Sequence, residues 1–368
     1  PRRIDRVLEN ESSLMRVAKD QAFPFVIPNA DPVPASNGSV WEGNASTAVL
    51  LADRASDGLD LVRSDYDGDR NAKTGLYALE NVDLFNLLCI PPIKRGGVEA
   101  DIPKETLSLA MRYCAERRAV LIVDSPSDWT SVQVITATNA KKLTDLGLSG
   151  TDARNAAIYF PRVIESDPLR NGQPDVFAPC GIVAGIIART DVQRGIWKAP
   201  AGIDAALLGP QDLKANLTDQ ENGMLNPLGI NCLRTFPAIG RVVWGARTLR
   251  GSDQLADEYK YIPIRRLALF IEESLFRGLK WVVFEPNDEP LWAQIRLNVG
   301  AFMHGLFSQG AFKGRTKQEA YFVKCDSETT TQNDADRGIV NVVVGFAPLK
   351  PAEFVVIKIQ QLAGQIQT

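Results

Sequence analysis

The amino-acid sequence predicts an α/β domain built on a parallel sheet, followed by an α+β domain. In the first part, apolar runs alternate with helical patterns in the order βαβαβα, which is typical of a parallel sheet covered on both faces. The run Leu84–Ile90 is continuously apolar and stops at Pro91-Pro92, as a strand buried on both sides would. The other elements predicted here are the strands Ala119–Val123 and Asn155–Pro161, and the helices Pro103–Arg117, from about Ser127, and Ala178–Thr190.

The second part of the sequence has a different rhythm, with strands that do not alternate regularly with helices. Ile264–Leu279 is predicted to be an amphipathic helix, with Leu267 and Ile271 inward and Arg265 and Arg266 outward. A second helix is predicted from about Pro290 to Gln309, because acidic residues followed by proline favour a helix start. The predicted strands are Ile230–Phe236 and Arg241–Leu249 (an antiparallel pair), Trp281–Phe284, Tyr321–Cys325, Ile339–Phe346 and Glu353–Ile359.

Four regions follow from these patterns. Residues 1–80 are rich in Asp, Asn, Ser, Gly and Pro and are expected to be an irregular N-terminal region. Residues 81–224 form the α/β domain, residues 225–350 the α+β domain, and residues 351–368 a C-terminal arm that two prolines would project from the body. The start at Pro1 and not at methionine suggests a processed or trimmed product, which allows for residues missing ahead of it.

Composition argues against several classes of function. The 41 basic and 44 acidic residues give a net charge of −3 without any basic block, so nucleic acid is not an expected partner. No apolar run approaches the roughly 20 residues that a membrane span requires. The cysteines form no CxxC pair, which argues against zinc and a disulfide framework and favours reduced thiols in a protein made in a cytoplasm. They are Cys89, Cys114, Cys180, Cys232 and Cys325.

Catalytic chemistry is weakly supported. His304 is the single histidine, so a serine or cysteine hydrolase would need it beside the nucleophile, and its helical position favours packing or partner contact instead. Asp124 and Ser125 directly follow a buried strand, where a parallel sheet often binds ligands, but Ser125–Asp128 equally suits a loop or a helix cap. A hydrolase using Asp124 or Ser125, detectable with a serine probe, and a small-ligand-binding α/β protein are therefore the alternative functions.

Metal and phosphate sites are also weakly supported. Asp65–Asp69 resembles a calcium loop, but its glycine comes too early and Leu76 occupies the twelfth position, where glutamate is needed. No P-loop and no GxGxxG pattern follows the first strand. The sequence thus predicts no catalytic residues, no metal and no cofactor.

A set of collinear motifs, spread over about residues 84–362, resembles the contractile phage-type tail sheath protein family. The strongest block is CGIVAGIIARTD at Cys180–Asp191, followed by GIWKAPAG at Gly195–Gly202. The other blocks, in the family's order, are Asn226–Asn231, Trp244–Thr248, Tyr261–Arg266, Phe284–Asp288 and Pro351–Val356.

This resemblance implies a subtilisin-like α/β domain without protease function and a C-terminal domain that faces an inner tube. Family members stack as six-fold rings in a helical sheath, which contracts to drive the tube through a target envelope. The implied partners are the chain itself, a tube protein, a baseplate and a tail terminator or cap. The implied location is a virion tail, tailocin or related contractile particle. The family's N-terminal arm is not recognisable ahead of Pro1, so it is either missing or different here.

Two sets of interface residues are expected. The terminal strand would exchange between subunits, because an extended segment with free backbone groups can complete a neighbour's sheet. Its residues are Glu353, Phe354, Val355, Val356, Ile357, Lys358 and Ile359. The helix from about Pro290 and the basic stretch after it would meet an acidic tube surface, through Gln294, Arg296, Asn298, Lys313, Arg315 and Lys317.

Overall fold

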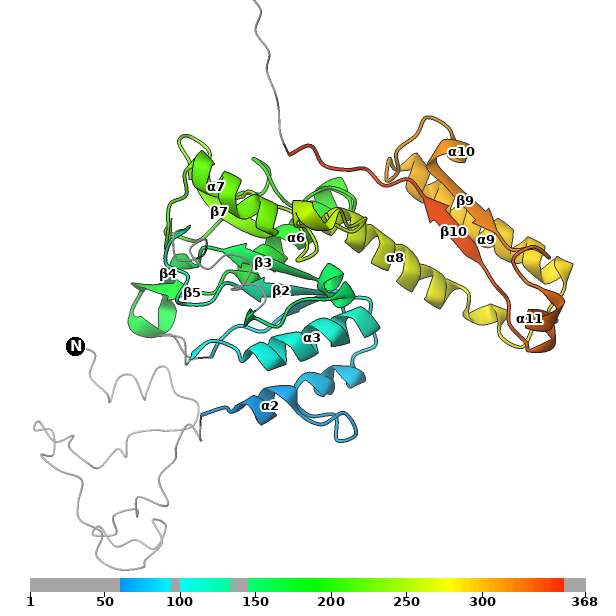
Figure 1. Cartoon of the computed structure of the whole chain (residues 1–368), viewed down its shortest axis with the longest axis horizontal. Helices are drawn as coiled ribbons and strands as arrows, with labels where there is room; N and C mark the ends of the chain where they lie inside the picture. The colour runs from blue at the N-terminus through cyan, green and yellow to red at the C-terminus, as the bar shows by residue number, and fades with distance from the viewer. Residues whose placement is uncertain (1–59, 94–99, 133–134, 136–144, 354–368) are drawn as a thin grey trace, which may run out of the picture. The chain divides into compact units, whose positions relative to one another are not determined.

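The structure is a computed structural model that describes residues 60–93, 100–132, 135 and 145–353 (Figure 1). The chain divides into two compact units, Pro1–Leu61 and Val62–Thr368, and the fold described below is that of the second unit. Within the described ranges, no helix combines the length and the apolar character needed to cross a membrane.

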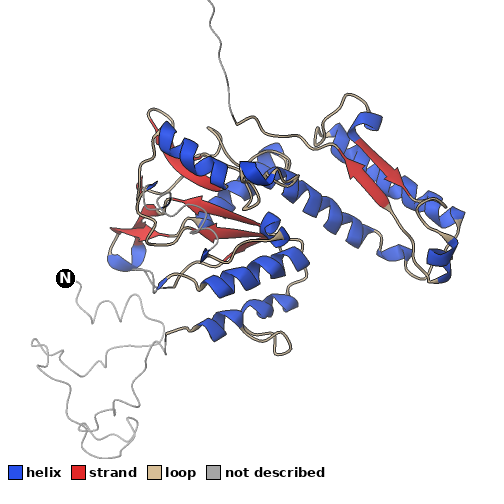
Figure 2. Cartoon of the chain, in the orientation of Figure 1, coloured by secondary structure: helices blue, strands red, loops and turns tan. Residues whose placement is uncertain are grey.

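A five-stranded sheet with the order β1-β2-β3-β7-β8 forms the centre of this unit (Figure 1 and Figure 2). Strands β1, β2, β3 and β7 are parallel, and β8 runs antiparallel to β7. The predicted parallel sheet is therefore confirmed. The strands are β1 (Leu87–Cys89), β2 (Val120–Asp124), β3 (Ala156–Phe160), β7 (Ile230–Phe236) and β8 (Gly240–Val243).

The sheet is covered on both faces because alternate side chains point to opposite sides. Leu121 and Val123 of β2 pack in one core with helix α3 (Lys104–Glu116), whereas Ile122 packs in another core with α6 (Cys180–Arg194). The α3 side chains buried against the sheet include Leu107, Ala110, Met111 and Cys114. The helix predicted from about Ser127 lies mostly outside the described residues.

Strands β7 and β8 belong to this central sheet, although the sequence analysis assigned them to the following region. Their pairing was predicted, but their attachment was not: Ile158 of β3 lies in register with Ile230 of β7. A strand that returns to a parallel sheet after about 70 residues leaves no local mark in the sequence, because its pairing partner is distant.

A second, three-stranded antiparallel sheet was not predicted. Its order is β5-β4-β6, and its strands are β4 (Val163–Asp167), β5 (Gln173–Phe177) and β6 (Asp212–Leu213). The β4–β5 hairpin turns through η5 (Pro168–Arg170) and two residues with positive φ, Asn171 and Gly172. Pro174 and Asp175 within β5 are residue types that strands disfavour, which explains why the sequence pattern missed it.

Helices dominate the C-terminal part. α8 (Ile262–Gly278) and α9 (Glu289–Ser308) pack in a third core with the antiparallel pair β9 (Tyr321–Lys324) and β10 (Val343–Phe346). The two predicted helices and the predicted strands at Tyr321–Cys325 and Ile339–Phe346 are confirmed here, although β10 is shorter than expected. Trp281–Phe284 is not a strand, and Phe354–Ile359 lie outside the described residues. The remaining short elements are α2 (Arg63–Asp67), η2 (Gly75–Asn81), η4 (Thr151–Asn155), α7 (Asp219–Leu225), η6 (Asn226–Leu228), η7 (Asp253–Leu255), η8 (Lys280–Val282), α10 (Lys317–Ala320) and α11 (Gln332–Asp336).

Two local predictions were wrong in this part. Trp281–Phe284 is not a strand: residues 280–282 form the 3₁₀ turn η8, and Phe284 has a φ of 73° that ends any extended run. Arg266 does not face solvent: it is buried, and its guanidinium donates to both carboxylate oxygens of Asp191 at 2.7 and 2.5 Å. A charged residue on an expected outer face was buried because α6 supplies an opposite charge.

Candidate functional site at the root of the C-terminal arm

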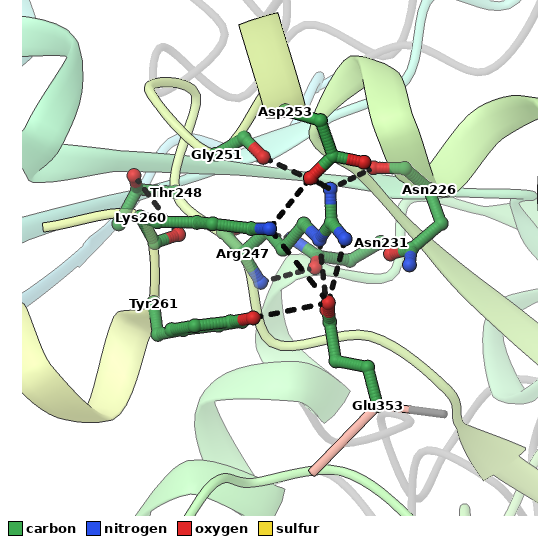
Figure 3. A network of polar contacts seen from close by, with 9 residues as sticks. All are labelled: Asn226, Asn231, Arg247, Thr248, Gly251, Asp253, Lys260, Tyr261 and Glu353. Carbon is green, nitrogen blue, oxygen red and sulfur yellow. Dashed lines mark hydrogen bonds and ion pairs between the residues drawn. The ribbon is translucent and has the colours of Figure 1, made fainter. Parts of the chain in front are cut away.

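A fully buried arginine lies just after β8. The side chain of Arg247 has no solvent exposure, and its guanidinium donates to the backbone oxygens of Asn226 at 2.9 Å and Gly251 at 3.0 Å (Figure 3). It also contacts a carboxylate oxygen of Asp253 at 3.1 Å. A buried charge is tolerated only when it is both hydrogen-bonded and paired with an opposite charge. These contacts supply hydrogen bonds, and the buried guanidinium also needs a carboxylate as its main ion-pair partner.

Glu353 supplies that carboxylate from the last described residue before the terminal segment. Arg247 Nε donates to Glu353 Oε1 at 2.7 Å and its terminal nitrogen to Oε2 at 2.6 Å, a bidentate pair with specific geometry. The hydroxyl of Tyr261 donates to the same carboxylate at 3.1 Å, and Lys260 Nζ lies 3.9 Å away (Figure 3). We call Arg247, Tyr261 and Glu353, with Lys260 and Asp253, the arm clamp.

The backbone of Arg247 is itself held in place. Asn231 of β7, which is fully buried, accepts from the backbone N–H of Arg247 at 2.7 Å and donates to its carbonyl at 2.7 Å. The same amide donates to the carbonyl of Ile158 in β3 at 3.1 Å. Gly245 makes room for this contact, since a Cβ there would lie 2.8 Å from Asn231. The arm clamp is therefore attached directly to the central sheet.

Electrostatics favour the charged pair. Burial alone would raise the pKa of Glu353, but the hydrogen bonds and charge of Arg247, with the Tyr261 hydroxyl and Lys260, outweigh it and hold the pKa below 4.5. For Arg247, burial acts to lower the pKa, and the contacts with Glu353 reverse that effect. Both groups are therefore ionised at neutral pH.

A cavity of about 580 Å³ adjoins the clamp. Its wall combines the aromatic rings of Trp197, Trp244 and Tyr261 with the arm root, residues 349–353. Residues of five of the motif blocks named above line it: the blocks that begin at Gly195, Asn226, Trp244, Tyr261 and Pro351.

The structure describes only Glu353 among the seven residues expected to exchange between subunits. Glu353 is not in a strand; its side chain is the carboxylate of the arm clamp. Phe354–Ile359 lie outside the described residues. Trp244–Thr248 resembles a family motif, but the sequence alone indicates no role for Arg247, because its partner Glu353 lies 106 positions away.

The expected tube-contact residues are mostly exposed. Gln294 and Asn298 are exposed on α9, and Lys313, Arg315 and Lys317 are exposed beyond it. Arg296 is half-buried instead, because its guanidinium pairs with Glu289 at 2.6 Å and donates to the carbonyl of Cys325. Five of the six residues are thus exposed, as a contact surface requires, and Arg296 is partly committed within the subunit.

The candidate catalytic residues are not assembled into a site. His304 is exposed on α9 beside the ring of Phe307, while Ser125 is buried just after β2, and Figure 1 shows β2 and α9 well separated. Asp124 accepts from the backbone N–H of Cys180 at 2.8 Å, at the start of α6. Its role in the described structure is therefore a helix cap.

The acidic loop Asp65–Asp69 is occupied with local hydrogen bonds. Asp65 accepts from the N–H of Val62, Asp67 from the hydroxyl of Thr106, and Asp69 from the N–H of Ala72. Among the described residues, no group of three or more potential metal ligands is clustered.

Two models of protein-family domains match this chain. A model of the phage tail sheath protein central domain matches residues 67–249, and one of the phage tail sheath C-terminal domain matches residues 256–361. The tail sheath protein of Vibrio phage KVP40 is 25% identical over 176 residues, which are 48% of this chain and 25% of the relative. The matched stretch is thus a quarter of that relative's length.

Solved structures agree with this match. The sheath complex of an extracellular contractile injection system, PVC, in the contracted state has a TM-score of 0.62 and 29% identity, over 79% of this chain and 75% of the other. A chain from the anti-feeding prophage baseplate has a TM-score of 0.61 and 28% identity, over 77% and 70%. The fold is that of a structural subunit of contractile tails. The chain belongs to the phage tail sheath family.

Proposed function

We propose that this chain is a sheath subunit that polymerises as six-fold rings around an inner tube and contracts to drive the tube through a target envelope. The observation that carries the proposal is the arm clamp, which fixes the exit of the C-terminal segment from the body. A segment fixed at its root and extended beyond it can join subunits while their bodies rotate. The partners would be further copies, a tube protein, a baseplate and a terminator, in a particle whose subunits are made in the bacterial cytoplasm.

The receiving surface for a neighbour's arm would be the β9–β10 pair. In the described part of the chain this sheet has only two strands, and α9 packs in the same core with it. Phe322 and Val343 on it are exposed by 51% and 44%. An arm with the apolar sequence Phe354–Ile359 would add main-chain hydrogen bonds along an edge and cover these side chains.

We also propose that the α/β part is a subtilisin-like framework without catalysis. Supporting this, Ser125 is buried just after β2, and His304 lies on α9, an element that Figure 1 shows well separated from β2. The division into residues 1–80, 81–224, 225–350 and 351–368 remains a proposal, and β7 and β8 argue for moving the 224/225 boundary beyond residue 243.

The direct test is electron microscopy of the purified full chain at high concentration. We expect tubes with six-fold symmetry, whereas a protein that stays monomeric at every concentration would contradict the proposal. A serine hydrolase would instead react with a fluorophosphonate probe, and labelling at Ser125 would favour the alternative function.

The tube-facing surface can be tested separately. Changing Lys313, Arg315 and Lys317 to Glu should leave sheath assembly intact but leave the sheath empty when it is co-expressed with the tube protein of its gene cluster. The matched control reverses three exposed charges on the α/β part: Lys104, Arg112 and Lys214. Loss of the tube in both variants, or in neither, would remove the case for this surface.

A further inference from the structure

Two cysteines and a carboxylate meet at one edge of the central sheet. Cys89 ends β1, Asp124 ends β2, and Cys180 opens α6. The Sγ of Cys89 lies 3.4 Å from the carbonyl oxygen of Cys180, and the N–H of Cys180 donates to Asp124 Oδ1 at 2.8 Å. The strand ends and the helix start therefore bring three residues together, although Asp124 is 56 positions and Cys89 is 91 positions before Cys180 in the sequence.

Accessibility distinguishes Cys89 from the other thiols. All five cysteines are described and all are free, but only Cys89 is not fully buried. Cys180, whose side chain contacts Cys89, is 1% exposed. A small oxidant arriving from solvent would therefore meet Cys89 first and find Cys180 as the neighbouring thiol.

Acidity points the same way. The contact with the Cys180 side chain lowers the pKa of Cys89 against the opposing effect of burial, and the same contact, with burial and the Asp124 carboxylate, raises the pKa of Cys180. Burial raises the pKa of Cys114 and Cys232 to about 12. The thiolate is the reactive form of cysteine, and Cys89 is the one of the five thiols that combines partial exposure with a lowered pKa. Burial raises the pKa of Asp124 to about 6, which makes its carboxylate a usable proton acceptor at neutral pH.

We propose that Cys89 and Cys180 are a redox pair that hydrogen peroxide converts to a disulfide joining β1 to the first turn of α6. The Cys89 thiolate attacks one peroxide oxygen, the O–O bond breaks, and the departing hydroxide takes up the thiol proton as water, leaving a sulfenic acid. Cys180 then transfers its proton to Asp124, and its sulfur attacks the Cys89 sulfur. The S–O bond breaks and the released hydroxide takes the proton from Asp124. Two thiols and one peroxide give one disulfide and two waters.

The consequence would be a stabilised central sheet. The cross-link would close a loop of 91 positions, and long closed loops restrict the unfolded chain most. We expect the oxidised protein to have a Tm several degrees higher than the reduced one, and dithiothreitol to reverse the shift. This inference is independent of the proposed function, since it concerns the folded subunit alone.

The experiment treats the full chain with stoichiometric hydrogen peroxide and counts thiols after denaturation. We expect a fall from five thiols to three, with a Cys89–Cys180 peptide found by mass spectrometry. Cys89→Ser should block the reaction, Cys180→Ser should stop it at a dimedone-reactive Cys89, and the control Cys232→Ser should react at the wild-type rate. Asp124→Asn should slow the second step, so that sulfenic acid accumulates. Unchanged thiols, a different pair, or unimpaired oxidation of Cys89→Ser would overturn the proposal.

Discussion

At the scale of single residues, the chain concentrates its buried charge on arginines whose carboxylate partners are far away in sequence. Arg247 pairs with Glu353 and Arg266 with Asp191, each through two hydrogen bonds. Such pairs are costly to break, because the remaining charge is then buried without a partner. Their value lies in fixing which segments meet: the arm with the central sheet, and α8 with α6.

The first prediction concerns Arg247. Arg247→Met should leave Glu353 without its partner and lower the free energy of unfolding by about 3–5 kcal/mol, measured by denaturant titration. The matched control is Arg194→Met, because Arg194 pairs with Asp204 at 2.8 Å on the surface, where such pairs contribute about 1 kcal/mol or less. Equal losses in the two variants would show that the buried clamp has no special role.

The second prediction concerns pH. A carboxylate with a lowered pKa stabilises the folded state above its ordinary value of 4.5, and that contribution is lost as the pH falls through the lowered value. The arm root should therefore become accessible to protease or hydrogen exchange in acid below about pH 4.5. In Glu353→Gln the root should be accessible already at pH 7, and a root equally protected at pH 7 in this variant would contradict the assignment.

At the scale of elements, α8 connects two cores. Ile262 in its first turn packs with the central sheet, and Leu267 and Ile271 in later turns pack with α9. The same helix follows directly from Tyr261, a member of the arm clamp. The helix therefore links the clamp to the core beneath β9 and β10.

The third prediction concerns the β9–β10 pair. A Cβ at Gly345 would lie 2.2 Å from the outer edge of the Phe322 ring, which is half-exposed and can turn aside, so Gly345→Ala should destabilise the fold by about 1 kcal/mol. Adding Phe322→Ala should recover part of that loss in a double-mutant cycle. In the control Gly300→Ala, where the helix has open space, stability should stay equal or rise by up to about 1 kcal/mol. A Gly345→Ala protein as stable as the wild type would refute the close contact.

Periodicity predicted the long elements well, because helix and strand patterns are local. It identified β1–β3, α3, α6, α8 and α9, whose apolar faces are continuous in sequence. It missed β4–β6, which are short and polar. It also mistook Trp281–Phe284 for a strand, because a short apolar run can equally lie in an exposed turn, and Phe284 is fully exposed. It found the motif around Arg247 but not its function, since a long-range ion pair has no local pattern.

At the scale of the whole molecule, the proposed assembly and contraction need no nucleotide and no catalytic centre. Assembly would come from added strand pairing between subunits, and contraction from further contacts as subunits rotate. In the proposed function, the arm clamp would keep the joint attached to the body while the segment beyond it connects to a neighbour. The extended form would persist through a kinetic barrier.

The most direct test of this account compares three chains by electron microscopy under identical conditions: the full chain, a chain ending at Glu353, and a control ending at Gln360. The control loses the last residues but keeps the proposed exchange strand, Phe354–Ile359. We predict tubes from the full chain and the control, and soluble folded subunits with an unchanged Tm from the chain ending at Glu353. Tubes from the chain that lacks the strand would contradict the central claim.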